Sequence, residues 1–170
     1  MPTLFVLRHA KSSWAEDDRP DHERRLAERG QKAGRRMATH IMDARIAPDV
    51  VLCSSATRAR ETLALVAAGF STRPDVRIDE RLYGADAAAI IALLQQELPP
   101  EVESVLVVGH NPALQDLVVE LAGEGDLRDE VAHKFPSGAL ATLQVGRAWA
   151  ELGPGEATLD AFVKPKQLDR

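Results

Sequence analysis

Short, uninterrupted runs of apolar residues constrain the fold of this chain more than any other feature. Leu4–Leu7 and Val105–Val108 contain only apolar residues, which is the pattern of strands that are buried on both faces of a parallel sheet. Between such runs, apolar residues recur at helical spacing, as in Gly30–Ala44 and Asp86–Leu98. Strands that alternate with helices predict an α/β fold: a three-layer sandwich with a mostly parallel central sheet and helices on both faces.

Five segments are expected to form the strands of this sheet. They are Thr3–Leu7, Val50–Ser54, Ser104–Val108, Ala139–Val145 and Ala157–Val163. The last two flank the turn sequence Gly153-Pro154-Gly155, so we expect them to pair as an antiparallel edge.

Two further helices complete the expected set. One follows the second strand, with apolar residues at helical spacing between Ala59 and Phe70. The other begins after the third strand, where Asn111 can cap a helix and Pro112 suits its first position, and it stops at Gly123.

Composition narrows the class of protein. The 170 residues, 45% of them apolar and 28% charged, are expected to form one domain over residues 1–170. A formal charge of −5 argues against nucleic-acid binding, which usually needs a basic face. Cys53 is the only cysteine, which excludes an internal disulfide and a multi-cysteine zinc site. No apolar run reaches the roughly 20 residues of a membrane span, and no secretory signal is evident, so we expect a cytoplasmic protein.

Polar residues follow three of the expected strands directly. Arg8 and His9 follow the first, Arg58 lies in the first turn of the helix after the second, and His110 follows the third. In open α/β sheets ligands bind beyond the carboxyl ends of the strands. A cation in the first turn of a helix opposes the macrodipole at a cost of up to about 1 kcal/mol, and a bound anion offsets that cost. The sequence therefore predicts an anion site, with phosphate as its natural occupant.

Six segments resemble motifs of the histidine phosphatase superfamily, and together they are most similar to its short phosphohistidine phosphatases of the SixA type. They occur in the family order and cover nearly the whole chain. The segments are Leu7–Ser12, Arg25–Gly30, Ser54–Thr62, Glu80–Gly84, Val108–Pro112 and Phe135–Ala139.

The resemblance assigns chemistry to matching residues. It implies that His9 is the nucleophile, which attacks phosphorus and forms a transient phosphohistidine. Arg8, Arg58 and His110 would bind the phosphoryl oxygens and neutralise their charge, which is most of what phosphoryl transfer requires. Ser12 is expected to contact the substrate as well. No metal and no cofactor is implied.

Glu80 is the expected proton donor, with Asp79, Asp86 and Glu61 as alternatives nearby in the sequence. A donor matters less for some substrates than for others, because an imidazole leaving group has a conjugate acid of pKa about 6.5. An alkoxide leaving from a sugar phosphate is far more basic and needs a proton in the transition state.

The chain departs from the family pattern at two positions. Ala10 stands where the superfamily motif has glycine, and Ala15 stands where larger relatives place an asparagine that contacts phosphate. The second departure and the short chain both weaken a comparison with the phosphoglycerate mutases. The preferred substrate is therefore phosphohistidine on a partner protein, and the alternative is a broad-range phosphatase of small phosphorylated metabolites. The oligomeric state stays open, with a monomer as the simplest case.

Other classes of protein fit the sequence less well. A non-catalytic phosphate-recognition module would need the arginines but not both His9 and His110. A metal hydrolase with His9, His110, His133 and Glu80 as ligands would place two arginines beside the cation, and no HExxH spacing occurs. A serine hydrolase would need a G-x-S-x-G elbow, which is absent. The segment Cys53–Arg58 is one residue short of a cysteine phosphatase loop and lacks its glycines.

Overall fold

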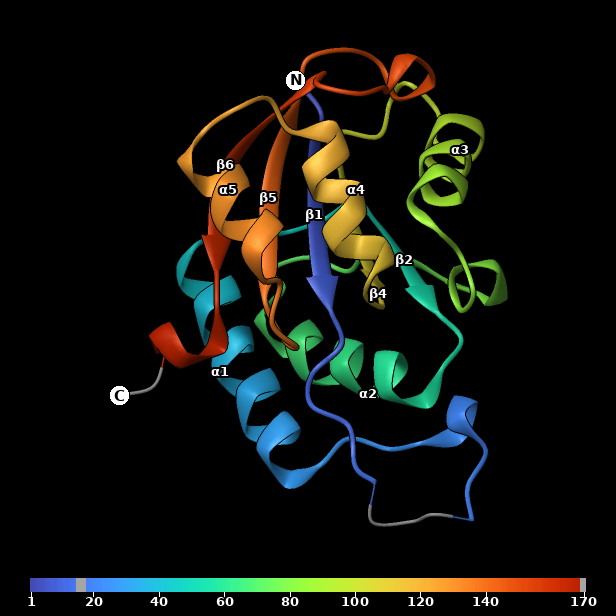
Figure 1. Ribbon diagram of the computed structural model, residues 1–170, viewed down its shortest axis with the longest axis vertical. Helices are drawn as coiled ribbons and strands as arrows, with labels where there is room; N and C mark the ends of the chain where they lie inside the picture. The colour runs from blue at the N-terminus through green and yellow to red at the C-terminus, as the bar shows by residue number, and fades with distance from the viewer. Residues whose placement is uncertain (15–17, 169–170) are drawn as a thin grey trace.

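The protein is described here by a computed structural model, which covers residues 1–14 and 18–168. Six strands, five α-helices and several short 3-10 turns follow one another along these residues (Figure 1). In chain order they are β1 (Thr3–Arg8), η1 (Asp21–Glu23), α1 (Glu28–Asp43), β2 (Val50–Ser54), α2 (Thr57–Val66), η2 (Ala67–Gly69), β3 (Asp75–Asp79), η3 (Glu80–Leu82), α3 (Ala87–Glu97), β4 (Ser104–Gly109), α4 (Ala113–Leu121), α5 (Asp126–His133), β5 (Leu140–Val145), η4 (Trp149–Glu151), β6 (Ala157–Val163) and η5 (Pro165–Leu168).

The strands form one mixed sheet in the order β3-β2-β4-β1-β5-β6. The first four of these strands are parallel to one another, while β5 is antiparallel to both β1 and β6. The mostly parallel sheet and its antiparallel edge are therefore confirmed. Because β2, β4 and β1 are adjacent and parallel, their carboxyl ends meet at the same edge, with Arg8 opposite Gly109.

The sheet separates two hydrophobic cores, so the expected three layers are present. Alternate residues of β1 point to opposite sides: Leu4 and Val6 pack with α3, α4 and α5, whereas Phe5 and Leu7 pack with α1 and α2. Figure 1 shows α4 and α5 in front of the strands and α1 on the other side. Burial on both faces explains why β1 and β4 read as continuous apolar runs.

Two elements differ from the sequence-based expectation. The strand β3 was not expected. Its sequence, DVRID, alternates apolar with charged residues, and it lies at the edge of the sheet, where most of its residues are exposed. The helix α5 was not expected either, because only Val131 of its eight residues is buried. The apolar pattern of both elements is too weak to identify them: β3 has only two apolar residues, both about half exposed, and α5 buries one side chain.

The expected helices are present with shifted ends. The helix before Phe70 ends as α2 at Val66 and continues as the 3-10 turn η2. The helix after β4 begins at Ala113 rather than Pro112, although the Asn111 side chain still accepts a hydrogen bond from the Gln115 N–H at 3.3 Å. Pro112 is therefore the N-cap residue, and Asn111, one residue before it, accepts from a free N–H group in the first turn of α4.

Helix α1 is fixed against the segment that follows β1. The Ala27 N–H donates to the Lys11 carbonyl at 2.9 Å, and Ser12 forms an isolated antiparallel bridge with Leu26. A Cβ atom at Gly30 would overlap the Lys11 carbonyl oxygen, so only glycine permits this approach. This explains why a glycine ends the Arg25–Gly30 motif.

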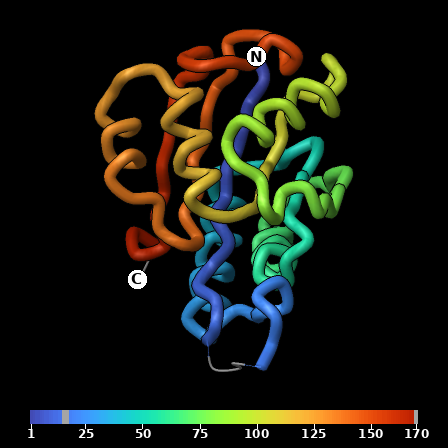
Figure 2. The backbone as a smooth tube through the Cα atoms, turned by 45° about the vertical axis from the view of Figure 1, so that its right-hand side comes forward, coloured from blue at the N-terminus to red at the C-terminus, as the bar shows by residue number. Residues whose placement is uncertain are grey.

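Figure 2 shows the segment after β1, in blue, extending beyond the carboxyl ends of the strands, at the end of the molecule away from the N-terminus. It therefore lies on the side of the sheet where the polar strand ends meet. Within the described residues, none of the helices is long and apolar enough to cross a membrane.

Candidate active site

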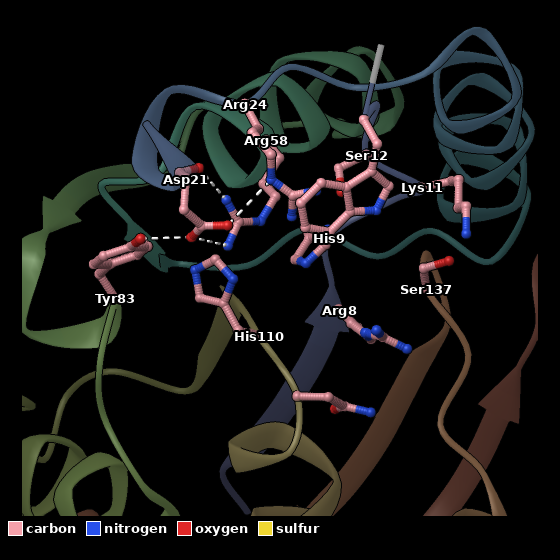
Figure 3. Close-up of a pocket in the computed structure, with 12 residues that line it drawn as sticks. Arg8, His9, Lys11, Ser12, Asp21, Arg24, Arg58, Tyr83, His110 and Ser137 are labelled. Carbon is pink, nitrogen blue, oxygen red and sulfur yellow. Dashed lines mark hydrogen bonds and ion pairs between the residues drawn. The ribbon is translucent and has the colours of Figure 1, made fainter. Parts of the chain in front are cut away.

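A cavity of about 560 Å³ opens beyond the ends of β1, β2 and β4. All four residues that the sequence placed at these strand ends, Arg8, His9, Arg58 and His110, line it, and so does Ser12 (Figure 3). The other lining residues are Lys11, Trp14, Asp21, Arg24, Tyr83, Asn111 and Ser137. The predicted convergence of two arginines and two histidines is therefore present.

His9 is held in one tautomer by the backbone. Its Nδ1 lies 2.7 Å from the carbonyl oxygen of Ala10. Because a carbonyl only accepts hydrogen bonds, Nδ1 carries the proton and the neutral ring has its lone pair on Nε2. The His9 N–H also donates to the Gly109 carbonyl at 3.0 Å, which fixes the residue at the junction of β1 and β4. The ring thus presents a nucleophilic nitrogen.

The pKa values of both histidines are lowered. Burial is the main cause for His9, whose pKa falls to about 3. The positive charges of Arg58 and Arg8, and that of His110 whenever it is protonated, lower it further. Burial also lowers the pKa of His110, to about 4, with Arg58 as the next cause. The two ring centroids are 5.1 Å apart. Both imidazoles are therefore neutral at pH 7, which is the form in which His9 can attack.

His110 is oriented by the end of β2. Its Nε2 lies 2.7 Å from the Ser54 hydroxyl, and that oxygen also accepts a hydrogen bond from the Ala56 N–H at 3.2 Å. Ser54 is fully buried. Because Nε2 is engaged, Nδ1 is the nitrogen of His110 that remains for a ligand.

Arg58 lies in the first turn of α2, as expected, and its side chain is 8% exposed. Its Nη1 donates to the Asp21 carbonyl at 2.7 Å, and its Nη2 lies 3.1 Å from Asp21 Oδ2. The Tyr83 hydroxyl donates to the same carboxylate oxygen at 2.6 Å, as the dashed lines in Figure 3 show. These hydrogen bonds, from Tyr83 first and also from Arg58, lower the pKa of Asp21.

Three arginines that line the cavity each have one buried nitrogen without a hydrogen-bond partner among the described residues: Arg8 Nε, Arg58 Nε and Arg24 Nη1. A buried donor that is left unsatisfied costs about 1–3 kcal/mol. Three such donors on residues that line one cavity are unusual in a native protein. The three arginines concentrate positive charge at the wall of the cavity, which favours the binding of an oxyanion there.

Ala10, where the family motif has glycine, fits without strain. Its N–H donates to the Thr62 hydroxyl at 3.0 Å, and that hydroxyl donates to the Arg58 carbonyl at 2.8 Å. Gly138 lies against Ala10, at a positive φ of 78° that favours glycine. Its N–H lies 3.0 Å from the carbonyls of Arg8 and His9. Ala15 lies outside the described residues.

Glu80 is exposed and is not among the residues that line the cavity, so its role as proton donor stays a prediction. The alternatives have structural partners. Asp79 accepts from Arg81, Asp86 caps α3 by accepting from the Ala89 N–H at 2.8 Å, and Glu61 accepts from the Leu26 N–H at 2.8 Å.

Asp21 is the carboxylate that the sequence analysis missed in the cavity. It lies in the polar segment between β1 and α1, which gives no periodic pattern. Tyr83 was present in the Glu80–Gly84 motif, but its contact with Asp21 spans 62 residues. No local pattern could have joined the two.

Two alternative chemistries can be compared with the structure. Cys53 is fully buried, and burial raises the pKa of its thiol to about 12, so it is not a reactive thiolate. Among the described residues, no group of three or more His, Cys, Asp or Glu side chains is placed to hold a metal ion.

The chain matches a known protein family. The family model of the histidine phosphatase superfamily (branch 1) matches residues 4–106. The chain therefore belongs to this superfamily, and it is a phosphatase.

Within the superfamily, the similarity is to SixA-type proteins. A candidate phosphohistidine phosphatase SixA from Nakamurella multipartitia has a TM-score of 0.85 and 31% identity, with 96% of each chain covered. A protein histidine phosphatase SixA in complex with tungstate has a TM-score of 0.81 and 25% identity, covering 98% of this chain and 99% of that one. An uncharacterized protein of Mycobacterium tuberculosis is 38% identical over 166 residues, which are 94% of this chain and 100% of the relative. A candidate α-ribazole-5′-phosphate phosphatase from Escherichia coli, at 18% identity and a TM-score of 0.70, shares the fold.

Proposed function

We propose that this phosphatase removes the phosphoryl group from phosphohistidine on a partner protein, without a metal ion. His9 Nε2 attacks phosphorus while the P–N bond to the substrate ring breaks. That ring is protonated on its other nitrogen, so the electron pair of the broken bond leaves on a neutral imidazole. Water then attacks phospho-His9, the P–Nε2 bond breaks with its electron pair returning to His9, and inorganic phosphate is released. The tautomer fixed by Ala10 supports the first step.

Arg8, Arg58 and His110 hold the phosphoryl oxygens in both steps. The position of all three residues in the lining of one cavity supports this assignment, because positive groups and donors fixed there stabilise the charge that develops on the oxygens. A bound dianion would also raise the pKa of His110, since it reverses the effect of the arginines. Ser12 lines the same cavity and is proposed as a further contact.

The observation that carries the choice of substrate is the state of Asp21. Among the described residues that line the cavity, it is the one carboxyl group, and its lowered pKa keeps it ionised at pH 7. An ionised carboxylate has no proton to give to a departing alkoxide, but an imidazole needs little such help. A cavity with these groups suits a phosphoramidate better than an alkyl phosphate ester. Asp21 can instead accept a proton from water in the second step.

The SixA-type neighbours support this proposal, since one is described as a candidate phosphohistidine phosphatase and another, with tungstate bound, as a protein histidine phosphatase. The alternative is hydrolysis of small phosphate esters, since the fold is shared with a candidate α-ribazole-5′-phosphate phosphatase and does not by itself separate the two substrate classes.

The test compares a histidine-containing phosphotransfer protein, phosphorylated on histidine, with a panel of sugar phosphates in the presence of EDTA. We expect a higher kcat/KM for the phosphoprotein and no turnover by His9→Ala, which also forms no acid-labile phosphoenzyme. A higher kcat/KM for any sugar phosphate would reject phosphohistidine as the substrate. Binding of phosphate without turnover of any compound would indicate a recognition module.

A further inference from the structure

A second hollow, which we call the basic groove, adjoins the catalytic cavity. It has a volume of about 610 Å³ and shares two lining residues, Lys11 and Ser137, with the cavity. In Figure 3 these two residues lie on the side of the cavity away from Asp21 and Tyr83. The groove therefore continues from the catalytic cavity in one direction.

Two walls enclose the basic groove. One is a face of α1, where Arg29, Lys32 and Arg36 recur at spacings of three, four and seven residues and so project from the same side. This row extends about 10 Å along the helix axis. The other wall comes from the end of α5 and from η5, which lies beside α1 in Figure 1, and it contributes Lys134 and Lys166.

The charge of the groove is opposite to that of the molecule. Among the residues that the structure describes, seven Lys and Arg side chains line it, against one Asp or Glu side chain. That acid, Glu130, is paired with Lys164 at 2.8 Å. The whole chain carries −5, so the surface elsewhere is acidic. An acidic partner would be repelled by most of the molecule and attracted at the groove.

The side chains of the basic groove differ from those of the catalytic cavity. Arg8 and Arg58 present partly or fully buried guanidinium groups in fixed positions. Lys32 and Lys134 are exposed, as is Lys11 at the junction. Exposed, flexible cations spread over several elements suit the irregular acidic surface of a protein, because they steer its approach without fixing one anion in place.

A close backbone contact also fixes the groove relative to His9, the proposed nucleophile. The start of α1 is packed against the Lys11 backbone through Gly30, and Lys11 lies two residues from His9. A protein that binds along α1 is therefore positioned relative to the catalytic cavity by a close backbone contact.

We infer that the basic groove is the docking surface for an acidic partner protein, whose carboxylates lie along α1 and η5 while its phosphohistidine enters the catalytic cavity. This inference rests on the proposed function for the nature of the phosphorylated residue. It adds the place and the charge of the partner's contact surface.

The test reverses one charge on each wall, in the variant Lys32→Glu/Lys134→Glu. The matched control is Arg35→Glu/Arg73→Glu, which changes the net charge equally: Arg35 is exposed on α1, Arg73 is exposed after α2, and neither lines the groove. The substrates are an acidic phosphotransfer protein phosphorylated on histidine, free phosphohistidine and a sugar bisphosphate. Each kcat/KM is measured at two salt concentrations, and the Kd of the phosphoprotein is measured in the His9→Ala background.

We expect the groove variant to lower kcat/KM for the phosphoprotein about 10-fold or more at low salt, with a parallel rise in Kd and a weaker salt dependence. Free phosphohistidine should be turned over at the rate of the unaltered protein, and the control variant should resemble it on all substrates. The proposal is overturned if the Kd of the phosphoprotein does not change, or if the control variant loses as much kcat/KM for the phosphoprotein as the groove variant does. It is also overturned if kcat/KM for the sugar bisphosphate falls as much as that for the phosphoprotein, because the groove would then be a subsite for a second phosphate.

The two proposals fail separately. If the unaltered protein hydrolyses neither form of phosphohistidine, the proposed function fails, while the Kd still tests docking. If it hydrolyses both and the groove variant does the same, the docking surface is wrong and the function stands.

Discussion

Replacing Asp21 by asparagine removes a negative charge from the catalytic cavity and keeps an oxygen that can accept from Tyr83 and Arg58. The Asp21 carboxylate lies 3.1 Å from Arg58 Nη2, so it competes with phosphate for the same guanidinium group. The backbone carbonyl of Asp21 still holds Arg58 Nη1 in the variant. Arg58 should therefore keep its position while its charge becomes more available.

The size of the effect follows from Coulomb's law. A phosphate dianion about 6 Å from the carboxylate is repelled by roughly 1.4 to 2.8 kcal/mol at effective dielectric constants of 80 to 40. The Asp21 side chain is 50% exposed, so solvent and salt reduce this range to about 1 to 2 kcal/mol. We therefore expect Asp21→Asn to bind inorganic phosphate roughly 5- to 30-fold more tightly.

The assay is the competitive inhibition constant of inorganic phosphate, or of tungstate, against an aryl phosphate at pH 7. Glu23→Gln is the matched control, because it makes the same change of charge in η1 at an exposed residue that does not line the cavity. Unchanged or weaker phosphate binding in Asp21→Asn would show that the carboxylate orients Arg58 more than it competes with the ligand.

Three more outcomes are expected. The lowered pKa values of His9 and His110 make the folded protein bind protons less readily than the unfolded chain. The free energy of unfolding should therefore fall as pH drops below about 6.5, by roughly 1.4 kcal/mol per pH unit for each histidine until pH approaches 4. Urea titrations from pH 7 to 4.5 measure this fall, and a free energy of unfolding that does not change with pH would contradict the lowered pKa values. Ser54→Ala frees Nε2 of His110 and should lower kcat about 10-fold by slowing both formation and decay of the His9 phosphoenzyme. Rapid-quench measurement follows the two steps, and unchanged rates for both would contradict an orienting role of Ser54. Glu80→Gln should leave kcat for an aryl phosphate and for phosphohistidine within about twofold, because Glu80 is exposed outside the cavity lining; a loss confined to alkyl phosphate esters would instead identify Glu80 as the proton donor.

The core of the fold was predictable because burial on both faces leaves a continuous apolar run. Such runs located β1 and β4, and their polar ends then located Arg8, His9 and His110. Parallel pairing brings the ends of adjacent strands to one edge, so the convergence of these residues followed from the sequence.

The remaining parts depend on contacts between distant segments. Asp21 and Tyr83 meet across 62 residues, and each lies at or beside a short 3-10 turn without periodicity. The basic groove was not predicted for the same reason. The basic residues of α1 could be recognised as one face of a helix, but Lys134 and Lys166, which form the other wall, come from elements that only the tertiary fold brings close. Sheet edges and loops carry little local information, and these are the places where the prediction was wrong or silent.

The contact between His9 and the carbonyl of Ala10 has a consequence for how this enzyme can evolve. Many catalytic histidines owe their orientation to a carboxylate, which one substitution removes and acid neutralises. Here the orienting group belongs to the main chain, so every residue at position 10 supplies it and no change of acidity abolishes it. Substitutions of neighbouring side chains can therefore alter which phosphorylated molecules are accepted, while Nε2 of His9, the nitrogen proposed to attack, keeps its lone pair.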